Sequence, residues 1–305
     1  MLSRAYKVDS SDSGEKLTKV ELKQVFSKYD AVCTMIYDEI DEEVIKSAGK
    51  NLKIVANFAV GFDNIDVIYA KKHGIVVANT PGVASQSVAE HTMMLILACS
   101  KRLIEADRFV RIGKFQRWDP ALFLSGQIYK KTIGIIGLGR IGTAVGQLAF
   151  NGFKMRILYN DIIRSEDFEM LCEAKMVTLS ELLSQSDFVT LHVPLISRTE
   201  HMIAENQLKL MKNTAFLINT SRGKVVAEKD LIWALTHNVI AGAGLDVFEN
   251  EPRVENELTK LPNVVLTPHI ASGTIETREA TAKLCAENII DVFSGRTPFG
   301  LVRVD

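Results

Sequence analysis

Short apolar runs alternate with amphipathic stretches along most of the chain. The apolar runs are rich in β-branched residues and lack a polar residue at every second position, so both faces of each strand are expected to be buried. Apolar residues at helical spacing recur between these runs. The alternation predicts an α/β fold in which helices cover parallel sheets on both sides. The expected strands lie within residues 30–36, 51–60, 74–82, 131–139, 154–161, 186–194, 214–221, 240–247 and 263–270.

Two long helical segments interrupt this alternation, at residues 85–113 and 274–296. The first is too long for an ordinary crossover between neighbouring strands, and together the two segments bracket a middle α/β block. The pattern therefore predicts two domains joined by two crossings of the chain. We expect a cofactor-binding domain at residues 101–271 and a first domain that combines residues 1–100 with residues 272–305.

The composition of the 305-residue chain argues against several classes of partner. With 47% hydrophobic residues, 24% charged residues and a formal net charge of −1, it has no excess of positive charge for nucleic acid or an anionic membrane. No apolar run reaches the length of a membrane span, and the first residues do not resemble a secretory signal. The four cysteines lie far apart without a CxxC pair, which predicts a cytoplasmic protein with reduced thiols and no metal site.

The most specific motif is formed by Gly137, Gly139 and Gly142 in "TIGIIGLGRIG". It follows an expected strand and opens an expected helix, which is the context of a dinucleotide-binding turn. The first glycine would permit the tight turn, the second the approach of a pyrophosphate, and the third the packing of the helix on the strand. Asp161 ends the next expected strand, where a carboxylate suits the ribose hydroxyls of NAD. A solvated turn residue is the alternative interpretation of Asp161.

Three polar side chains follow other expected strands: Arg222 after "AFLINTS", Glu251 after "AGAGLDV", and His269 at the end of "NVVLTPH". In open α/β sheets ligands bind at the carboxyl ends of the strands, so all three are expected at one edge. Reduction of a 2-keto acid needs a cation for the carboxylate, an acid for the developing alkoxide, and a carboxylate that orients the acid. These residues supply one group of each kind.

Each of the three also has a purely structural interpretation. Arg222 suits a surface turn, Glu251 a turn, and His269 a capping or core position. Together these interpretations require three separate coincidences at one edge of a sheet. His192 ends another strand and is the rival acid, but Pro194 follows closely and indicates a loop that lines the cofactor.

With these residues in view, the chain strongly resembles the D-2-hydroxyacid dehydrogenase family from about residue 30 onward. In order and spacing the motifs that carry the resemblance are highly specific: "VGFDNID", "NTPGV", "GIIGLGRIG", "HVPL", "LMKNTAFLINTSRGKVV", "AGAGLDVFENEP" and "LTPHIASGT". The segments "EADRFVRIGKF" and "MRILY", together with Trp118, are most similar to its glyoxylate/hydroxypyruvate reductase branch.

The resemblance implies a role for each matching residue. Arg222 would bind the substrate, Glu251 would support the histidine, and His269 would act as the acid/base. The backbone at Val60 and Gly61 would grip the substrate carboxylate from the other domain. Arg222, His269 and the turn glycines are also implied to line the cofactor site. The other residues implied to line it are Arg140, Ile141, Val193, Pro194, Thr220 and Asp246, the last of them near the nicotinamide carboxamide.

The family further implies a flavodoxin-like substrate domain, a Rossmann domain that binds NAD, with NADP also possible, a cleft between them, and a homodimer. The implied activity is hydride transfer between NAD(P)H and a small 2-keto acid of the glyoxylate or hydroxypyruvate type, giving the D-2-hydroxy acid. Two alternatives stay open: a phosphoglycerate-type dehydrogenase, and an NAD(H)-sensing binding protein on the same fold.

Two departures from the family pattern carry expectations of their own. The helix after Gly142 is about one residue longer than usual, which leaves open whether Asp161 or Asn160 meets the ribose. The chain also lacks the apolar opening strand of the family's substrate domain. Since loss of such a strand exposes backbone groups, we expect the chain to be shorter than the natural gene product. A first domain that rearranges or pairs with another chain is the alternative.

Overall fold

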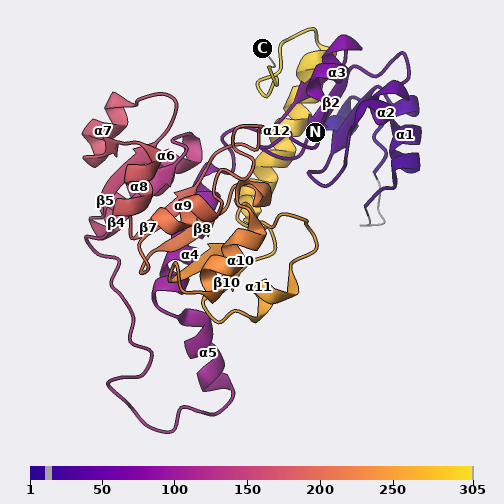
Figure 1. Cartoon of the computed structure of the whole chain (residues 1–305). Coiled ribbons are helices and arrows are strands. Elements are labelled where there is room, and N and C mark those ends of the chain that lie inside the picture. The colour runs from indigo at the N-terminus through magenta and orange to yellow at the C-terminus, as the bar shows by residue number, and fades with distance from the viewer. Residues whose placement is uncertain (11–15, 304–305) are drawn as a thin grey trace. The chain divides into compact units, whose positions relative to one another are not determined.

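The computed structural model describes residues 1–10 and 16–303, and the chain divides into two compact units. The first unit contains Met1–Ala84 and Thr274–Asp305, and the second contains Ser85–Gly273. Each unit has its own parallel sheet with helices packed on it (Figure 1). This confirms the predicted α/β class.

The first unit is built on a three-stranded sheet in the order β1-β2-β3. A capping box of Thr18 and Glu21 begins its first α-helix. The helices α1, α2 and α3 pack on one face of the sheet, and α12 supplies Ile289 to a smaller cluster with residues of β2 and β3. The elements are η1 (Leu2–Arg4), α1 (Lys19–Lys28), β1 (Ala31–Thr34), α2 (Glu42–Lys46), β2 (Ile54–Asn57), α3 (Val67–Lys72), β3 (Val76–Ala78) and α12 (Ile275–Phe293).

The second unit is built on a seven-stranded sheet in the order β10-β9-β8-β7-β4-β5-β6, with every pair parallel. The order runs outward in both directions from β4, as in doubly wound dinucleotide-binding folds, whose ligands bind where the order reverses. The elements are α4 (Ser85–Ser100), α5 (Leu103–Arg111), β4 (Thr132–Ile136), α6 (Arg140–Phe153), β5 (Arg156–Asn160), α7 (Glu166–Cys172), β6 (Lys175–Met176), α8 (Leu179–Gln185), β7 (Phe188–Leu191), α9 (Glu205–Leu210), β8 (Phe216–Asn219), η2 (Gly223–Val225), α10 (Glu228–Thr236), β9 (Gly242–Leu245), α11 (Asn256–Lys260) and β10 (Val264–Leu266).

The helix α4 belongs to the second unit, whereas the sequence predicted that the first domain extends to residue 100. The physical reason is the glycine-rich strand β9, "GAGL". A Cβ built on Gly244 would lie 3.1 Å from Leu95 and 3.2 Å from the Cys99 sulfur, so the small strand residues let α4 pack closely on the sheet. The divisions of the chain therefore fall at residues 84 and 273, not at 100 and 271.

All nine predicted strands are present with tighter bounds, while the two-residue strand β6 was not predicted. The segment 85–113, predicted as one helix, is two helices, α4 and α5. They are separated at Arg102, whose backbone is left-handed with a φ of 54°. The helix α5 buries none of its side chains, and α5 and the loop after it extend away from the seven-stranded sheet (Figure 1). Within the described part of the chain, every helix is too short or too polar to cross a bilayer.

Candidate active site

The glycine-rich turn connects β4 to α6 at the point where the strand order reverses. Gly137 has a φ of 93°, and a side chain there would collide with the backbone of His192, 2.8 Å away. Gly139 is the N-cap of α6, and a Cβ built on it meets none of the described atoms within 4 Å. Arg140 and Ile141 follow in the first turn. Open space in front of backbone N–H groups fits the pyrophosphate of a dinucleotide.

Asp161 lies directly after β5 and is tied to the glycine turn. Its Oδ2 accepts a hydrogen bond from the N–H of Leu138 (2.6 Å), and its Oδ1 accepts one from the N–H of Ile162 (2.6 Å). The side-chain amide of Asn160 instead donates to the carbonyl of Val177 (2.8 Å). Of the two candidates for the ribose, Asp161 is the one that contacts the turn.

The loop after β7 carries His192, Val193 and Pro194. The Nε2 of His192 lies 2.9 Å from Thr190 Oγ1, and its Nδ1 is buried without a hydrogen-bond partner among the described residues. Burial lowers the pKa of His192 to about 3, which makes it a poor proton donor at neutral pH. The side chain of Val193 lies against Gly137, and Pro194 is exposed. The rival histidine is therefore unsuited to act as the acid.

Arg222 follows β8 at the carboxyl edge of the sheet. Thr220 beside it is buried, and its Oγ1 lies 3.0 Å from Thr92 Oγ1 of α4. The carbonyl of Arg222 accepts a hydrogen bond from the side-chain amide of Asn219 (2.9 Å). The guanidinium is partly exposed, and its Nη1 donates to the carbonyl of Ser221 (2.8 Å). The loop thus has a fixed backbone and presents a cation at this edge.

The loops after β8 and β9 are in backbone contact. A Cβ on Gly223 would collide with the backbone of Phe248, so glycine is required for the two loops to approach. The N–H of Phe248 in turn donates to Glu251 Oε1 (2.9 Å). The second carboxylate oxygen of Glu251 accepts a hydrogen bond from Nδ1 of His269 (2.7 Å). The structure therefore brings Glu251 and His269 into direct contact, beside the loop that carries Arg222.

A buried carboxylate fixes the loop after β10. Asp246 is fully buried, and it accepts hydrogen bonds from the Thr267 hydroxyl (2.5 Å) and from the N–H groups of Ile270 (2.9 Å) and Ala271 (2.8 Å). Its own carbonyl accepts from the N–H of His269 (2.8 Å), whose φ is 53°. Asp246 thus holds the backbone on both sides of His269 in one conformation.

The sequence analysis did not single out His91 of α4. Its side chain is 12% exposed, and its Nε2 lies 2.9 Å from Thr267 Oγ1 and 3.4 Å from Asp246 Oδ1. Burial raises the pKa of Asp246, but hydrogen bonds from His91, Thr267 and the backbone outweigh it and hold that pKa below its usual value. The available signal was one histidine within the apolar helix "VAEHTMMLIL", a pattern more typical of a core residue.

Val60 and Gly61 belong to the first unit, in the loop after β2. The side-chain amide of Asn79 donates to the carbonyl of Val60 (2.7 Å), and that of Asn57 donates to the carbonyl of Gly61 (2.8 Å). Both carbonyls are therefore held by the protein itself. The role of this loop in substrate binding stays a prediction.

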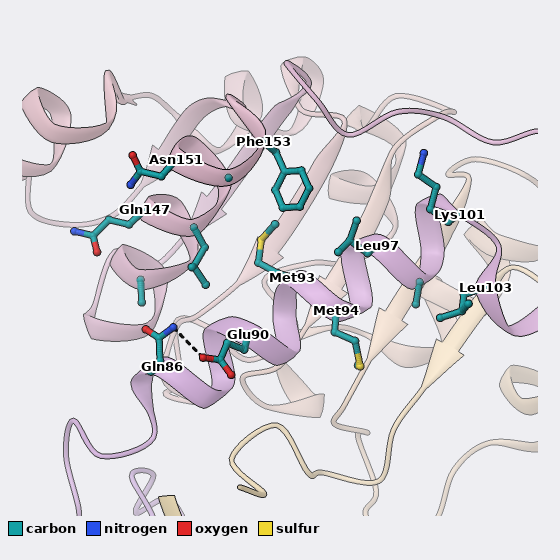
Figure 2. A pocket seen from close by; sticks show the side chains of 14 residues that line it. Gln86, Glu90, Met93, Met94, Leu97, Lys101, Leu103, Gln147, Asn151 and Phe153 are labelled. Carbon is teal, nitrogen blue, oxygen red and sulfur yellow. Dashed lines mark hydrogen bonds between the residues drawn. The ribbon is translucent and has the colours of Figure 1, made fainter. Parts of the chain in front are cut away.

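A groove of about 850 Å³ lies elsewhere on the second unit, between α4 and α6. Figure 2 shows Met93 and Phe153 next to one another in it, and Gln86 donating a hydrogen bond to Glu90 (3.0 Å). Most of its lining side chains are apolar, and it contains none of the residues predicted to bind substrate or cofactor. The groove is therefore a separate surface.

Comparison with known proteins gives consistent matches. Residues 93–271 match the family model described as D-isomer specific 2-hydroxyacid dehydrogenase, NAD binding domain. The chain is 52% identical over 275 residues to the glyoxylate reductase of Korarchaeum cryptofilum (strain OPF8), covering 90% of this chain and 82% of that protein. The glyoxylate reductase of Thermococcus onnurineus (strain NA1) is 47% identical over 306 residues, covering 99% and 91%. Among solved structures, the D-lactate dehydrogenase from Aquifex aeolicus complexed with NAD and lactic acid is 34% identical, with a TM-score of 0.83 and coverage of 90% and 85%.

The dinucleotide-binding strand order, the glycine turn and these matches define an NAD(P)-dependent oxidoreductase that acts on a CH–OH group. More narrowly, the chain belongs to the D-isomer-specific 2-hydroxyacid dehydrogenases, as the sequence motifs predicted.

Proposed function

We propose that the protein reduces a small 2-keto acid of the glyoxylate or hydroxypyruvate type to the D-2-hydroxy acid, with NADH as its preferred cofactor. The observation that carries the proposal is the 2.7 Å contact between Glu251 Oε2 and His269 Nδ1, beside the loop of Arg222. The identity of 52% to a glyoxylate reductase supports the substrate class.

In this proposal each of the three side chains has one task. The guanidinium of Arg222 binds the substrate carboxylate with two parallel hydrogen bonds and polarises the adjacent carbonyl. Because the Glu251 carboxylate is an acceptor, it keeps a proton on Nδ1 of His269 and fixes the orientation of the ring. Nε2 of His269 then donates its proton to the alkoxide oxygen as negative charge develops there. The nicotinamide ring, when bound, supplies the hydride.

The chain's own residues also fit the rest of the cofactor. Backbone N–H groups from Gly139 to Ile141 would bind the pyrophosphate, and Asp161 would accept hydrogen bonds from the adenosine ribose. Val193 and Pro194 would line the adenine side. We assign Asp246 a positioning task, because its carboxylate is occupied by the loop of His269. We further place the enzyme in the cytoplasm, which its four unpaired thiols support.

A turnover assay with a panel of 2-keto acids tests the proposal. With NADH we expect the highest kcat/KM for glyoxylate and hydroxypyruvate, because the guanidinium of Arg222 at this edge binds one carboxylate. Preference for a phosphorylated keto acid would instead identify a phosphoglycerate-type enzyme. NADH binding without turnover of any keto acid would identify an NAD(H)-sensing protein and overturn the proposal.

The same assay run with NADPH measures the role of Asp161. A carboxylate at the ribose repels a 2′-phosphate, so kcat/KM with NADH is expected to exceed that with NADPH by roughly tenfold or more, about 1.4 kcal/mol. The nearby cation Arg164 is engaged by Glu169, 2.7 Å away, and so offers the phosphate little compensation. Asp161→Ser should lower the ratio of kcat/KM with NADH to kcat/KM with NADPH. Glu166→Gln, at the exposed start of α7, should leave this ratio unchanged. Equal efficiency with both cofactors would show that Asp161 does not face the ribose.

We also propose that the partner of the α4–α6 groove is a second copy of this chain, forming a homodimer. Support comes from the segment after α4, which carries many exposed apolar side chains: Leu103, Ile104, Val110, Ile112, Phe115, Trp118, Leu122 and Leu124. This apolar segment extends from its own sheet, and the apolar groove lies beside it on the same chain. In a dimer, the segment of each copy can therefore pack in the groove of the other copy.

Light scattering after gel filtration measures this state. The protein is expected at about twice 33.8 kDa, and Met94→Glu in the groove or Val110→Glu on α5 is expected to shift it to the monomer mass, because a charge would be buried in the interface. Met170→Glu provides a matched control, since Met170 is 80% exposed on α7 and lies outside both surfaces. A monomeric parent protein, or variants that stay dimeric, would contradict this assembly.

A further inference from the structure

Two of the four cysteines face one another in the first unit. Cys33 lies on β1 opposite Ala56 of β2, so their side chains share one face of the sheet. Ala56 packs in the cluster to which α12 contributes Ile289. Cys285 precedes Ile289 by one helical turn and so lies on the same side of α12. The strand and helix periodicities therefore place both thiols on the side of the sheet that faces α12.

The two thiols interact side chain to side chain but lie in different environments. Cys33 is exposed, whereas Cys285 is buried, with its Sγ 3.6 Å from the carbonyl oxygen of Asn57, to which it donates. The contact with Cys285 lowers the pKa of the Cys33 thiol, and the same contact together with burial raises the pKa of Cys285. Cys33 is thus the thiolate former, and Cys285 keeps its proton.

We propose that Cys33 and Cys285 form a peroxide-sensitive thiol pair, in which a hydroperoxide oxidises Cys33 and Cys285 then closes a reversible disulfide. In the first step the Cys33 thiolate attacks one peroxide oxygen. An S–O bond forms, the O–O bond breaks, and the leaving oxygen takes a proton to become water or an alcohol. In the second step the sulfur of Cys285 attacks that of Cys33. An S–S bond forms, the S–O bond breaks, and the hydroxide leaves as water with the proton of Cys285. Two thiols and one hydrogen peroxide thus give one disulfide and two waters.

The pair is linked to the loop after β2 through Asn57. The side-chain amide of Asn57 donates to the carbonyl of Gly61 (2.8 Å) and to Asn64 Oδ1 (3.0 Å). A disulfide removes the S–H donor of Cys285 from the carbonyl of Asn57 and draws α12 toward β1. This consequence rests on the proposed function and on the role that the family resemblance implies for the backbone at Gly61, which is to bind the substrate carboxylate. Oxidation is then expected to weaken substrate binding.

The other two cysteines are natural controls. Cys99 and Cys172 are buried in the second unit, on α4 and α7. Burial raises the pKa of Cys99 to about 12, and burial also raises that of Cys172. Neither is expected to ionise or react at neutral pH.

The test treats the reduced full chain with hydrogen peroxide, blocks the remaining thiols by alkylation and maps the peptides by mass spectrometry. We expect a loss of about 2 Da, two fewer alkylated cysteines, and a cross-linked peptide pair that contains Cys33 and Cys285. The KM for glyoxylate is expected to rise roughly 2- to 12-fold, the effect of one lost hydrogen bond, and to return on addition of dithiothreitol. Cys172→Ser should respond like the parent protein.

The single variants complete the test. In Cys285→Ser the Cys33 sulfenic acid has no resolving thiol, so oxidation should continue to the sulfinic acid, with a gain of about 32 Da. In Cys33→Ser neither product should form. Absence of the cross-linked peptide in the parent protein overturns the chemistry of the proposal. Its presence without a change in KM overturns the link to the loop after β2. If the protein turns over no keto acid, the peptide result still decides the chemistry, and the proposed function alone fails.

Discussion

His269→Gln is expected to lower kcat for reduction of a 2-keto acid by roughly 10²–10⁴, the usual contribution of a positioned proton donor. Glutamine can still donate a hydrogen bond to Glu251, but it has no proton to transfer at neutral pH. NADH binding is expected to persist, because the dinucleotide turn follows β4 whereas His269 follows β10. Steady-state kinetics and a fluorescence titration of NADH measure the two effects separately.

His237→Gln is the matched control for this change. His237 is exposed at the end of α10, where its Nδ1 lies 2.8 Å from the carbonyl oxygen of Trp233, and its replacement should leave kcat unchanged. Near-normal activity in His269→Gln, together with inactivity in His192→Gln, would show that the acid is His192. The structure gives a reason to expect otherwise, since burial holds the pKa of His192 at about 3.

Arg222→Lys is expected to raise KM and to lower kcat together. Lysine keeps the positive charge but loses the planar fork that holds a carboxylate through two parallel hydrogen bonds. The expected fall in kcat/KM is roughly 10- to 150-fold, which corresponds to about 1.5–3 kcal/mol for one hydrogen bond to a charged group. Initial rates across a range of glyoxylate concentrations separate the two constants.

Lys224→Gln removes a cation two residues away, on an exposed position of the same loop, and should leave kcat/KM near the parent value. This comparison separates a specific contact of Arg222 from the general charge of the loop. An unchanged kcat/KM in Arg222→Lys would mean that Arg222 is an ordinary surface residue held by the carbonyl of Ser221.

The fold class was predictable because most of the strands are apolar runs rich in β-branched residues, such as "TIGII" of β4 and "FVTL" of β7. The turn after β4 was predictable for a similar local reason, since three glycines at fixed spacing follow a strand and begin a helix. The shared edge of Arg222, Glu251 and His269 was predicted from the parallel direction of the strands, because the carboxyl ends of parallel strands lie together. Each strand and the glycine turn are encoded within a few residues of one another.

The features that were missed depend on contacts between distant segments. Nothing within α4 indicates that it packs on β9, because that contact is permitted by the missing side chain of Gly244. His91 acquires its place beside Asp246 and Thr267 only when α4 meets the loop after β10. The strand β6 has only two residues, which are too few to show a periodic pattern in the sequence. Similarly, Asp161 and Asn160 are neighbours in sequence, and only their different hydrogen bonds distinguish them.

The first unit is assembled from two stretches of chain that are made at different times. Its three strands are synthesised early, but α12, which supplies Ile289 against Ile54, Ala56 and Ala78, emerges only after residues 85–273. At roughly 5–20 residues per second, this delay is on the order of 10 to 40 seconds. During that interval the second unit, which is continuous in sequence, has everything it needs to fold, while the first sheet waits with an apolar face uncovered. The nascent chain therefore exposes this apolar face until α12 is synthesised and packs on it.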